Sequence, residues 1–271
     1  QVAELQEFVR RFSANASKAK QATSRAKQID KIKIEDMKPS SRQYPFIRFE
    51  YEEKDKLYRQ AVTINKLSHA YEKPLFDNVN FMVEAGEKVA IIGENGIGKS
   101  TLLKILANTV NPNDGSVKWA EKAKISYFAK DHNDEFDKST SIFDWINDFK
   151  QAQDDDQSIK SILGRLLFSG DDFKKKVNVL SGGEQGRMLF GKIMLERNNI
   201  LLLDEPTNHM DMESIESLNT ALDKYKGTVF FVTHDREFVS SVATRIFEIK
   251  SDKIIDYTGN YEDYIAAQEL D

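Results

Sequence analysis

The stretch GENGIGKS at residues 93–100 decides the fold of this 271-residue chain. It fits the pattern G-x-x-x-x-G-K-[S/T] of a phosphate-binding loop, in which glycines let successive backbone N–H groups point at phosphate oxygens. An apolar run at residues 89–92 precedes the loop, and a helix-compatible run at residues 101–106 follows it. Phosphate binding requires this strand–loop–helix order, which a chance glycine-rich turn before a lysine does not supply. The sequence therefore predicts nucleotide binding.

Individual positions of the loop have predicted tasks. The Lys99 ammonium is expected to reach the β- and γ-phosphates, and the Ser100 hydroxyl to hold Mg²⁺. The residues that we expect to bind the nucleotide in this loop are Gly93, Asn95, Gly96, Gly98, Lys99, Ser100 and Thr101.

Two adjacent carboxylates follow a second apolar run. Residues 200–203 are Ile-Leu-Leu-Leu, and Asp204 and Glu205 come directly after them. Buried parallel strands deliver ligands at their carboxyl ends, where the phosphate loop is also expected. Asp204 is then placed to hold Mg²⁺, and Glu205 to accept a proton from an attacking water as general base. The alternative is a strand that simply ends in exposed acids.

The hexapeptide LSGGEQ at residues 180–185 precedes another helical pattern. Ser181 is a predicted N-cap, and Gly182 and Gly183 leave backbone amides exposed at a second helix N-terminus. The hexapeptide resembles the signature motif of ABC-type ATPases, and the resemblance covers about residues 60–271. It implies an α/β fold, a P-loop ABC-type nucleotide-binding domain with a mixed sheet core, an antiparallel β subdomain and a helical subdomain. The ligands it implies are ATP and Mg²⁺.

The resemblance also implies roles for individual residues. In this family the signature, here Ser181, Gly182, Gly183 and Glu184, closes over the γ-phosphate bound by another domain. His234 resembles the histidine that contacts the γ-phosphate and positions water, and with Glu205 and Lys99 completes the expected catalytic set. Tyr71 resembles the aromatic residue that stacks on adenine, and Asp211 the loop aspartate that meets the partner domain. A structural histidine and an ordinary strand aromatic are the alternatives for His234 and Tyr71.

One position departs from the family pattern. The family has glutamine after the strand predicted at residues 125–129, where its amide reaches the metal and water, but this chain has Lys130. A lysine brings a fixed point charge to a place where a neutral amide is expected. Either that charge partly replaces the charge of the metal, or Lys130 lies away from the site.

Sequence outside the core motifs resembles one branch of the ABC-type ATPases, the ABC-F family. EPTNHMD at residues 205–211 is similar to the ABC-F sequence EPTNHLD. The stretches THDREF at residues 233–238 and GNYEDY at 259–264 also resemble ABC-F sequences. The family implies two ATPase domains on one chain, a charged helical linker between them, and no membrane partner. The alternatives are a nucleotide-binding subunit of a membrane transporter, and a nucleotide-switched binding module with little turnover.

Charge is distributed unevenly along the chain. The net charge is −5, but residues 8–33 contain eight basic residues and one acid, so this window carries +7 and the rest carries −12. A basic arm on an acidic body suits a polyanionic partner, although a solvated helix without a partner is the alternative. The family implies the ribosome, through rRNA and tRNA. The candidates for RNA contact are Arg10, Arg11, Lys18, Lys20, Arg25 and Lys27.

The domain boundaries are predicted from composition and from residues that break helices and strands. We expect a basic helical linker at residues 1–38, a connecting segment at 39–59 in which Ile47, Phe49 and Tyr51 alternate as in a strand, and the ABC ATP-binding domain at 60–271. The chain has no cysteine, which excludes thiolate metal sites and cysteine nucleophiles. It has no apolar run of about 20 residues that could cross a bilayer, and no signal-peptide pattern. We therefore expect a cytoplasmic protein. The ABC-F resemblance further implies that it is one half of a longer chain, and that this half binds ATP but hydrolyses it poorly alone.

Overall fold

The computed structural model describes residues 44–136, 138–250 and 253–268. The predicted linker at residues 1–38 lies outside these residues, and so do the candidate RNA contacts within it. The described strands form two sheets, one antiparallel and one mixed. No helix among the described residues is long and apolar enough to span a membrane.

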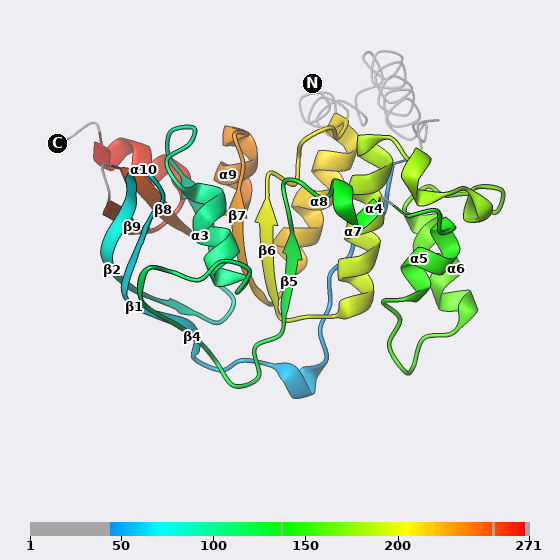
Figure 1. Ribbon diagram of the computed structural model, residues 1–271, viewed down its shortest axis with the longest axis horizontal. Helices are drawn as coiled ribbons and strands as arrows, with labels where there is room; N and C mark the ends of the chain where they lie inside the picture. Colours follow the sequence, from blue (N-terminus) through cyan, green and yellow to red (C-terminus); the bar gives the residue numbers. More distant parts are fainter. Residues whose placement is uncertain (1–43, 137, 251–252, 269–271) are drawn as a thin grey trace, which may run out of the picture. The chain divides into compact units, whose positions relative to one another are not determined.

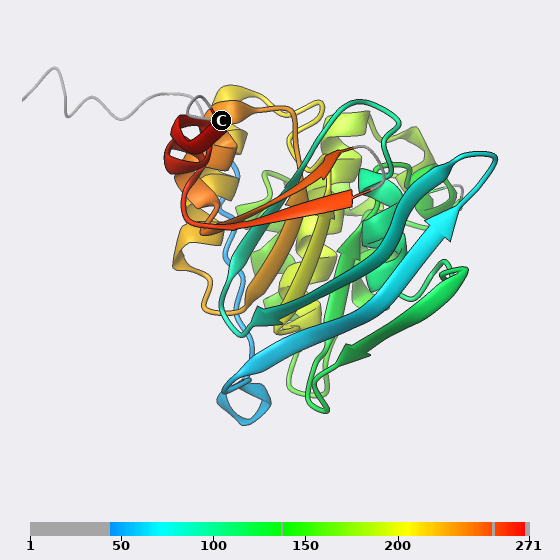
Figure 2. The ribbon, with the colours of Figure 1, turned by 90° about the vertical axis from the view of Figure 1, so that its left-hand side faces the viewer.

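The antiparallel sheet has the strand order β2-β1-β4. Its strands are β1 (Gln60–Ala70), β2 (Pro74–Glu84) and β4 (Asp114–Trp119). Along β1 the buried residues Val62, Ile64 and Leu67 are separated by residues that are more exposed, which is the pattern of a sheet with one buried face. Figure 2 shows this sheet in front of the central strands of the mixed sheet.

The mixed sheet has the order β5-β6-β7-β3-β8-β9. Its strands are β3 (Lys88–Ile92), β5 (Ile125–Phe128), β6 (Ile200–Asp204), β7 (Thr228–Val232), β8 (Arg245–Lys250) and β9 (Lys253–Thr258). All neighbours are parallel except β8 and β9. Every residue of β6 and β7 is buried, as expected for parallel strands covered on both faces. The carboxyl ends of β5 and β6 point to the same edge (Figure 1).

Helices cover both faces of the mixed sheet. They are α3 (Lys99–Leu106), α4 (Asn133–Phe136), α5 (Ile142–Asn147), α6 (Asp156–Arg165), α7 (Gly182–Glu196), α8 (Met212–Lys224), α9 (Arg236–Val242) and α10 (Tyr261–Gln268). On one face Ile200 and Leu202 of β6 pack in the cluster that contains α3 and the antiparallel sheet. On the other face Leu201 and Leu203 pack in the cluster that contains α5 to α9.

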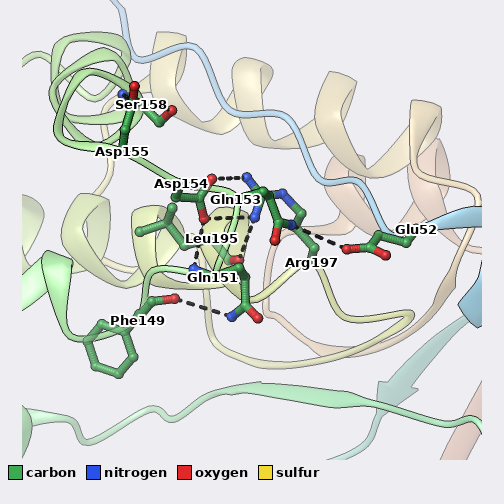
Figure 3. Close-up of polar contacts among 9 residues, drawn as sticks. All are labelled: Glu52, Phe149, Gln151, Gln153, Asp154, Asp155, Ser158, Leu195 and Arg197. Atoms are coloured by element: carbon green, nitrogen blue, oxygen red, sulfur yellow. Dashed lines mark hydrogen bonds and ion pairs between the residues drawn. The ribbon is translucent and has the colours of Figure 1, made fainter.

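An ion pair connects the loop before α6 to the end of α7. The guanidinium of Arg197 donates two hydrogen bonds to the Asp154 carboxylate, and Gln153 Nε2 lies 3.3 Å from Glu52 Oε1 (Figure 3). The Asp154 side chain is buried, and the Arg197 hydrogen bond holds the pKa of its carboxyl below the usual range. These contacts fix the helical segment α5–α6 against the body of the domain.

The strand predicted around residues 47–51 is wrong. Ile47 and Phe49 are buried and their neighbours exposed, as the alternation predicts, but the backbone pairs with no strand of the described sheets. The segment instead packs on helix side chains, with the Phe49 ring 6.3 Å from the ring of Phe190 in α7. Alternation reports which side chains are buried, and here the surface that buries them is a helix rather than a sheet edge.

Candidate functional site

The phosphate-binding loop connects β3 to α3 as predicted. Gly98 precedes α3 with φ of 116°, a conformation that glycine adopts without strain. The Lys99 side chain folds back over the loop, and its ammonium donates to the carbonyl oxygens of Gly93 at 2.8 Å and Glu94 at 2.7 Å. Burial lowers the pKa of Lys99, and the nearby Glu205 carboxylate opposes this shift. The loop therefore holds a largely buried ammonium at its centre.

Asp204 ends β6 directly beside the start of α3. The Ser100 hydroxyl donates to Asp204 Oδ1 at 3.1 Å, while Asp204 Oδ2 is buried with no hydrogen-bond partner among the described residues. Asp204 is fully buried, and burial raises the pKa of its carboxyl, against the effect of the Ser100 hydrogen bond. An unpartnered buried carboxylate oxygen is costly unless a cation or water occupies the space beside it.

This pair fits a magnesium ion. Mg²⁺ takes oxygen ligands and usually keeps several waters and phosphate oxygens, so one hydroxyl and one carboxylate suffice from the protein. Ser100 and Asp204 supply these two oxygens, and the second Asp204 oxygen has no other partner within the described chain. No group of three or more acidic or histidine side chains among the described residues offers a competing metal site.

Glu205 faces His234 across the ends of β6 and β7. His234 Nε2 lies 2.9 Å from Glu205 Oε1; the histidine side chain is 57% exposed, whereas that of Glu205 is 3% exposed. The Glu205 backbone has φ of 53°, and its N–H donates to the Val232 carbonyl oxygen. This left-handed turn ends the strand and redirects the side chain, while Glu205 Oε2 stays buried without a partner in the described residues.

One cavity gathers most of the predicted ATP-site residues. Its volume is about 310 Å³, and it is lined by Tyr71, Leu75, Asn95, Gly96, Gly98, Lys99, Ser100, Thr101, Lys130, Glu205 and His234. Asp204 does not line this cavity, but its carboxylate accepts a hydrogen bond from the lining residue Ser100. Gly93 lines a neighbouring cavity of about 240 Å³, which also contacts Lys99 and His234. Residues separated by more than a hundred positions in the sequence thus meet at one edge of the mixed sheet.

Tyr71 stands at the edge of this cavity. It lies in the turn between β1 and β2, is 64% exposed, and meets the buried His69 ring edge-on at 4.9 Å between centroids. An exposed aromatic face beside a phosphate loop is suited to stacking on a nucleotide base. The His69 contact limits the orientations that the tyrosine ring can adopt.

The signature residues do not line the cavity. Ser181 caps α7, accepting from the Glu184 N–H, while the Glu184 carboxylate accepts from Ser181 and from Lys175 Nζ at 2.7 Å. Burial acts to raise the pKa of Glu184, but these partners outweigh it and lower the pKa to about 2. Ser181 and Gly182 are exposed. The chain thus presents the N-terminus of α7 away from its own ATP-site cavity.

The loop that contains Asp211 lies against the signature. Asp211 caps α8 by accepting from the Ser214 N–H at 2.8 Å. A side-chain carbon on Gly183 would lie only 3.2 Å from the His209 carbonyl oxygen, so glycine is favoured where the two loops pack. Two candidate partner-domain elements, predicted separately, are therefore neighbours on one surface.

Some residues of the site were not predicted from the sequence. Leu75 lines the cavity, and a side-chain carbon on Gly98 would lie 3.1 Å from it. The Tyr127 hydroxyl is buried with no partner among the described residues, and burial together with the Asp204 charge raises the pKa of Tyr127. Thr207 and Thr233 join the loops after β6 and β7 through their hydroxyls, 3.0 Å apart. Contacts of this kind leave no periodic signal in a sequence.

Comparisons with known proteins agree with this geometry. The profile of a family described as ABC transporter matches residues 76–208, and a second profile with the same description matches residues 1–49. Over the whole chain the sequence is 59% identical to YbiT of Escherichia coli O157:H7, whose name describes it as an ATP-binding protein. It is 41% identical over 98% of the chain to YkpA of Bacillus subtilis, an ABC transporter ATP-binding protein by name. It is 38% identical over 96% of the chain to ABC transporter F family member 2 of Arabidopsis thaliana.

The chain spans 51% of YbiT, 49% of YkpA and 38% of the Arabidopsis protein. Among solved structures, an inward-facing metal-chelate type ABC transporter matches with a TM-score of 0.61 and 22% identity, over 78% of this chain and 87% of that one. CbiO1 of Clostridium perfringens, part of an ABC transporter complex, also has a TM-score of 0.61, with 21% identity over 79% and 93% of the two chains. These two structures share the fold.

Fold, site and relatives together define an ABC-type ATP-binding domain. The chain belongs to the ABC-F family of ATP-binding proteins.

Proposed function

We propose that this chain binds ATP with Mg²⁺ and hydrolyses it, as one of two ABC domains of a cytoplasmic translation factor that acts on the ribosome. ATP binding and hydrolysis are supported by one observation: Lys99, Ser100, Glu205 and His234 line the same cavity, and Asp204 is hydrogen-bonded to Ser100. Phosphoryl transfer to water needs charge neutralisation and a positioned water more than covalent chemistry, and these residue types supply both.

The residues have distinct tasks in the proposed hydrolysis. Lys99 neutralises charge on the β- and γ-phosphates, since its ammonium lies at the phosphate-binding loop. Ser100 and Asp204 hold Mg²⁺, which supplies positive charge to the phosphate oxygens when bound. Glu205 accepts a proton from the attacking water, and the 2.9 Å contact with His234 orients the carboxylate. Tyr71 stacks on the adenine.

The position of the signature supports a site shared between two domains. Ser181 and Gly182 are exposed and Ser181–Glu184 lies away from the cavity, so these residues are available to a nucleotide bound elsewhere. Asp211 lies in the loop packed against them. We propose that this surface closes on a second ABC domain of the same longer protein, so that two ATP molecules are clamped between the domains.

The ribosome part of the proposal rests on charge and family. The segment at residues 8–33 carries +7, and Lys and Arg side chains attract RNA phosphates without reading bases. We propose rRNA and tRNA as its partners. The ABC-F relatives support this over a transporter subunit, because the sequence is similar to them over almost the whole chain, the basic segment included.

The proposal is tested with Glu205→Gln in the complete two-domain protein. The variant keeps the shape of the side chain but removes the base, so it is expected to hold ATP and stay on ribosomes during sedimentation with ATP. A Lys99→Ala, Glu205→Gln double variant is the matched control, because it lacks the ammonium that binds phosphate and should not be retained. Equal ribosome retention with and without ATP would contradict the translation-factor proposal.

A further inference from the structure

A second lysine besides Lys99 lines the ATP-site cavity. Lys130 follows β5 and lines the cavity together with Lys99, Ser100 and Glu205. Its side chain is exposed, and it makes no hydrogen bond or ion pair within the part of the chain that the structure describes. Of the two positions considered for this lysine, at the site or away from it, the structure supports the first.

The charge of Lys130 reaches both sides of the site. Burial raises the pKa of the Asp204 carboxyl most strongly, and Lys130 is one of the cations that act in the opposite direction. Burial lowers the pKa of Lys99, and repulsion from Lys130 lowers it further. The Lys130 ammonium is therefore close enough to both groups for its charge to act on them.

The site contains two carboxylates that repel a triphosphate. Asp204 and Glu205 are buried, and each has one oxygen with no partner in the described residues. The Lys99 ammonium already donates to two loop carbonyl oxygens, whereas the Lys130 ammonium makes no hydrogen bond within the described residues. A lysine ammonium is a mobile point charge on a flexible stem, so it can approach phosphate oxygens and carboxylates alike.

We propose that Lys130 is an ATP-binding residue whose ammonium offsets the charge of the triphosphate beside the Asp204–Glu205 pair, and so makes ATP binding at this site less dependent on a divalent cation. The inference rests on the proposed ATP binding and adds a specificity to it. With Mg²⁺ present the two cations compete for the same negative charge, and Lys130 contributes little. Without Mg²⁺ it is the only lysine other than Lys99 in the described lining of the cavity.

The test is the affinity for ATP, measured by titration calorimetry at constant ionic strength, in excess Mg²⁺ and in EDTA. In EDTA, Lys130→Gln is expected to bind ATP about tenfold more weakly than the unaltered chain, the loss of one partly exposed charge contact. In Mg²⁺ the same substitution should change the affinity by less than about threefold. Lys130→Arg, which keeps the charge, should restore binding in EDTA.

Lys104→Gln is the matched control. Lys104 also acts on the Asp204 carboxyl but does not line the cavity, so its substitution should leave the affinity for ATP in EDTA unchanged. An equal loss for Lys130→Gln in Mg²⁺ and in EDTA, or no loss in either, overturns the inference while leaving ATP binding itself intact. Failure of the unaltered chain to bind ATP under both conditions overturns the proposed function as well.

Discussion

Gly93 shows how narrow the choice of residue is in the phosphate-binding loop. It has φ of 141°, and a side-chain carbon there would lie 2.6 Å from the carbonyl oxygen of Ile249 in β8. Both the backbone conformation and the available space therefore exclude a side chain. The loop must approach β8 closely because β3 and β8 are paired neighbours in the mixed sheet.

We predict that Gly93→Ala lowers the free energy of unfolding by about 2 kcal/mol or more and weakens ATP binding, because the loop must shift to relieve the clash. Gly96→Ala is the matched comparison: its φ of 77° is also strained for alanine, but nothing lies within 4 Å of the added carbon. The free energy of unfolding of that variant should fall by about 1 kcal/mol. Urea unfolding of both variants measures the difference, and equal losses would argue against a packing role for Gly93.

For single residues, the sequence predicts those that the chemistry of the site requires, but not the side chains that pack around them. Lys99, Ser100 and Glu205 stand at fixed spacings or strand ends, and the structure brings them to one cavity. Leu75 and Tyr127 approach the site from other strands, and which strands are neighbours depends on the order of the sheet. Residue types alone also left two positions open for Lys130.

Helix α7 begins with a set of interactions that couple the signature to pH. The Glu184 carboxylate accepts from the Ser181 N–H and hydroxyl and forms an ion pair with Lys175, and its pKa falls to about 2. A carboxyl whose pKa is lowered on folding stabilises the folded state above its unfolded pKa near 4.5. That contribution is lost as the pH falls through about 2.

We therefore predict that Glu184→Gln lowers the free energy of unfolding by about 1 kcal/mol at pH 7, and that the difference from the unaltered chain shrinks below pH 4.5. Urea unfolding between pH 7 and pH 3 measures it. Glu121→Gln serves as control, since Glu121 is exposed in the turn before β5. A difference that stays constant across this range would mean that the Glu184 charge has no part in the cap.

Helices and strands were predicted correctly from the sequence where the pattern of apolar residues matches the burial that the structure gives them. The apolar runs at residues 89–92 and 200–203 predict strands, and the structure confirms them as the buried parallel strands β3 and β6. The prediction of a strand at residues 47–51 failed because alternation records burial on one side without identifying the element that buries it. Ser181 as N-cap is confirmed, since capping is a local interaction.

On the scale of the whole molecule, two separate surfaces carry the proposed function. The ATP-site cavity lies at the carboxyl ends of β3, β5, β6 and β7, with the loop residues and Lys130 around it. The N-terminus of α7 and the adjoining loop at Asp211 form a second surface that does not line this cavity. In our proposal, a nucleotide in the cavity has donors from this chain on one side and from a second domain on the other.

The family resemblance implies that the signature serves a nucleotide bound by another domain, but linear order alone does not give the direction in which α7 begins. The structure supplies that direction through the packing of the signature on His209 rather than on the phosphate-binding loop. The central claim of our proposal is that this chain binds ATP by itself, and that a signature from another domain completes its site.

The most direct test of that claim is ATP turnover by the chain, held monomeric as judged by light scattering, beside turnover by the complete two-domain protein in the same Mg²⁺ buffer. The monomeric chain is expected to bind ATP but to release phosphate about a hundredfold more slowly, the effect of missing preorganised donors at the γ-phosphate. The substitution Ser181→Ala should slow ATP turnover by the complete protein. In the isolated chain the same substitution should not weaken ATP binding. Full-rate turnover by the monomeric chain would contradict the account.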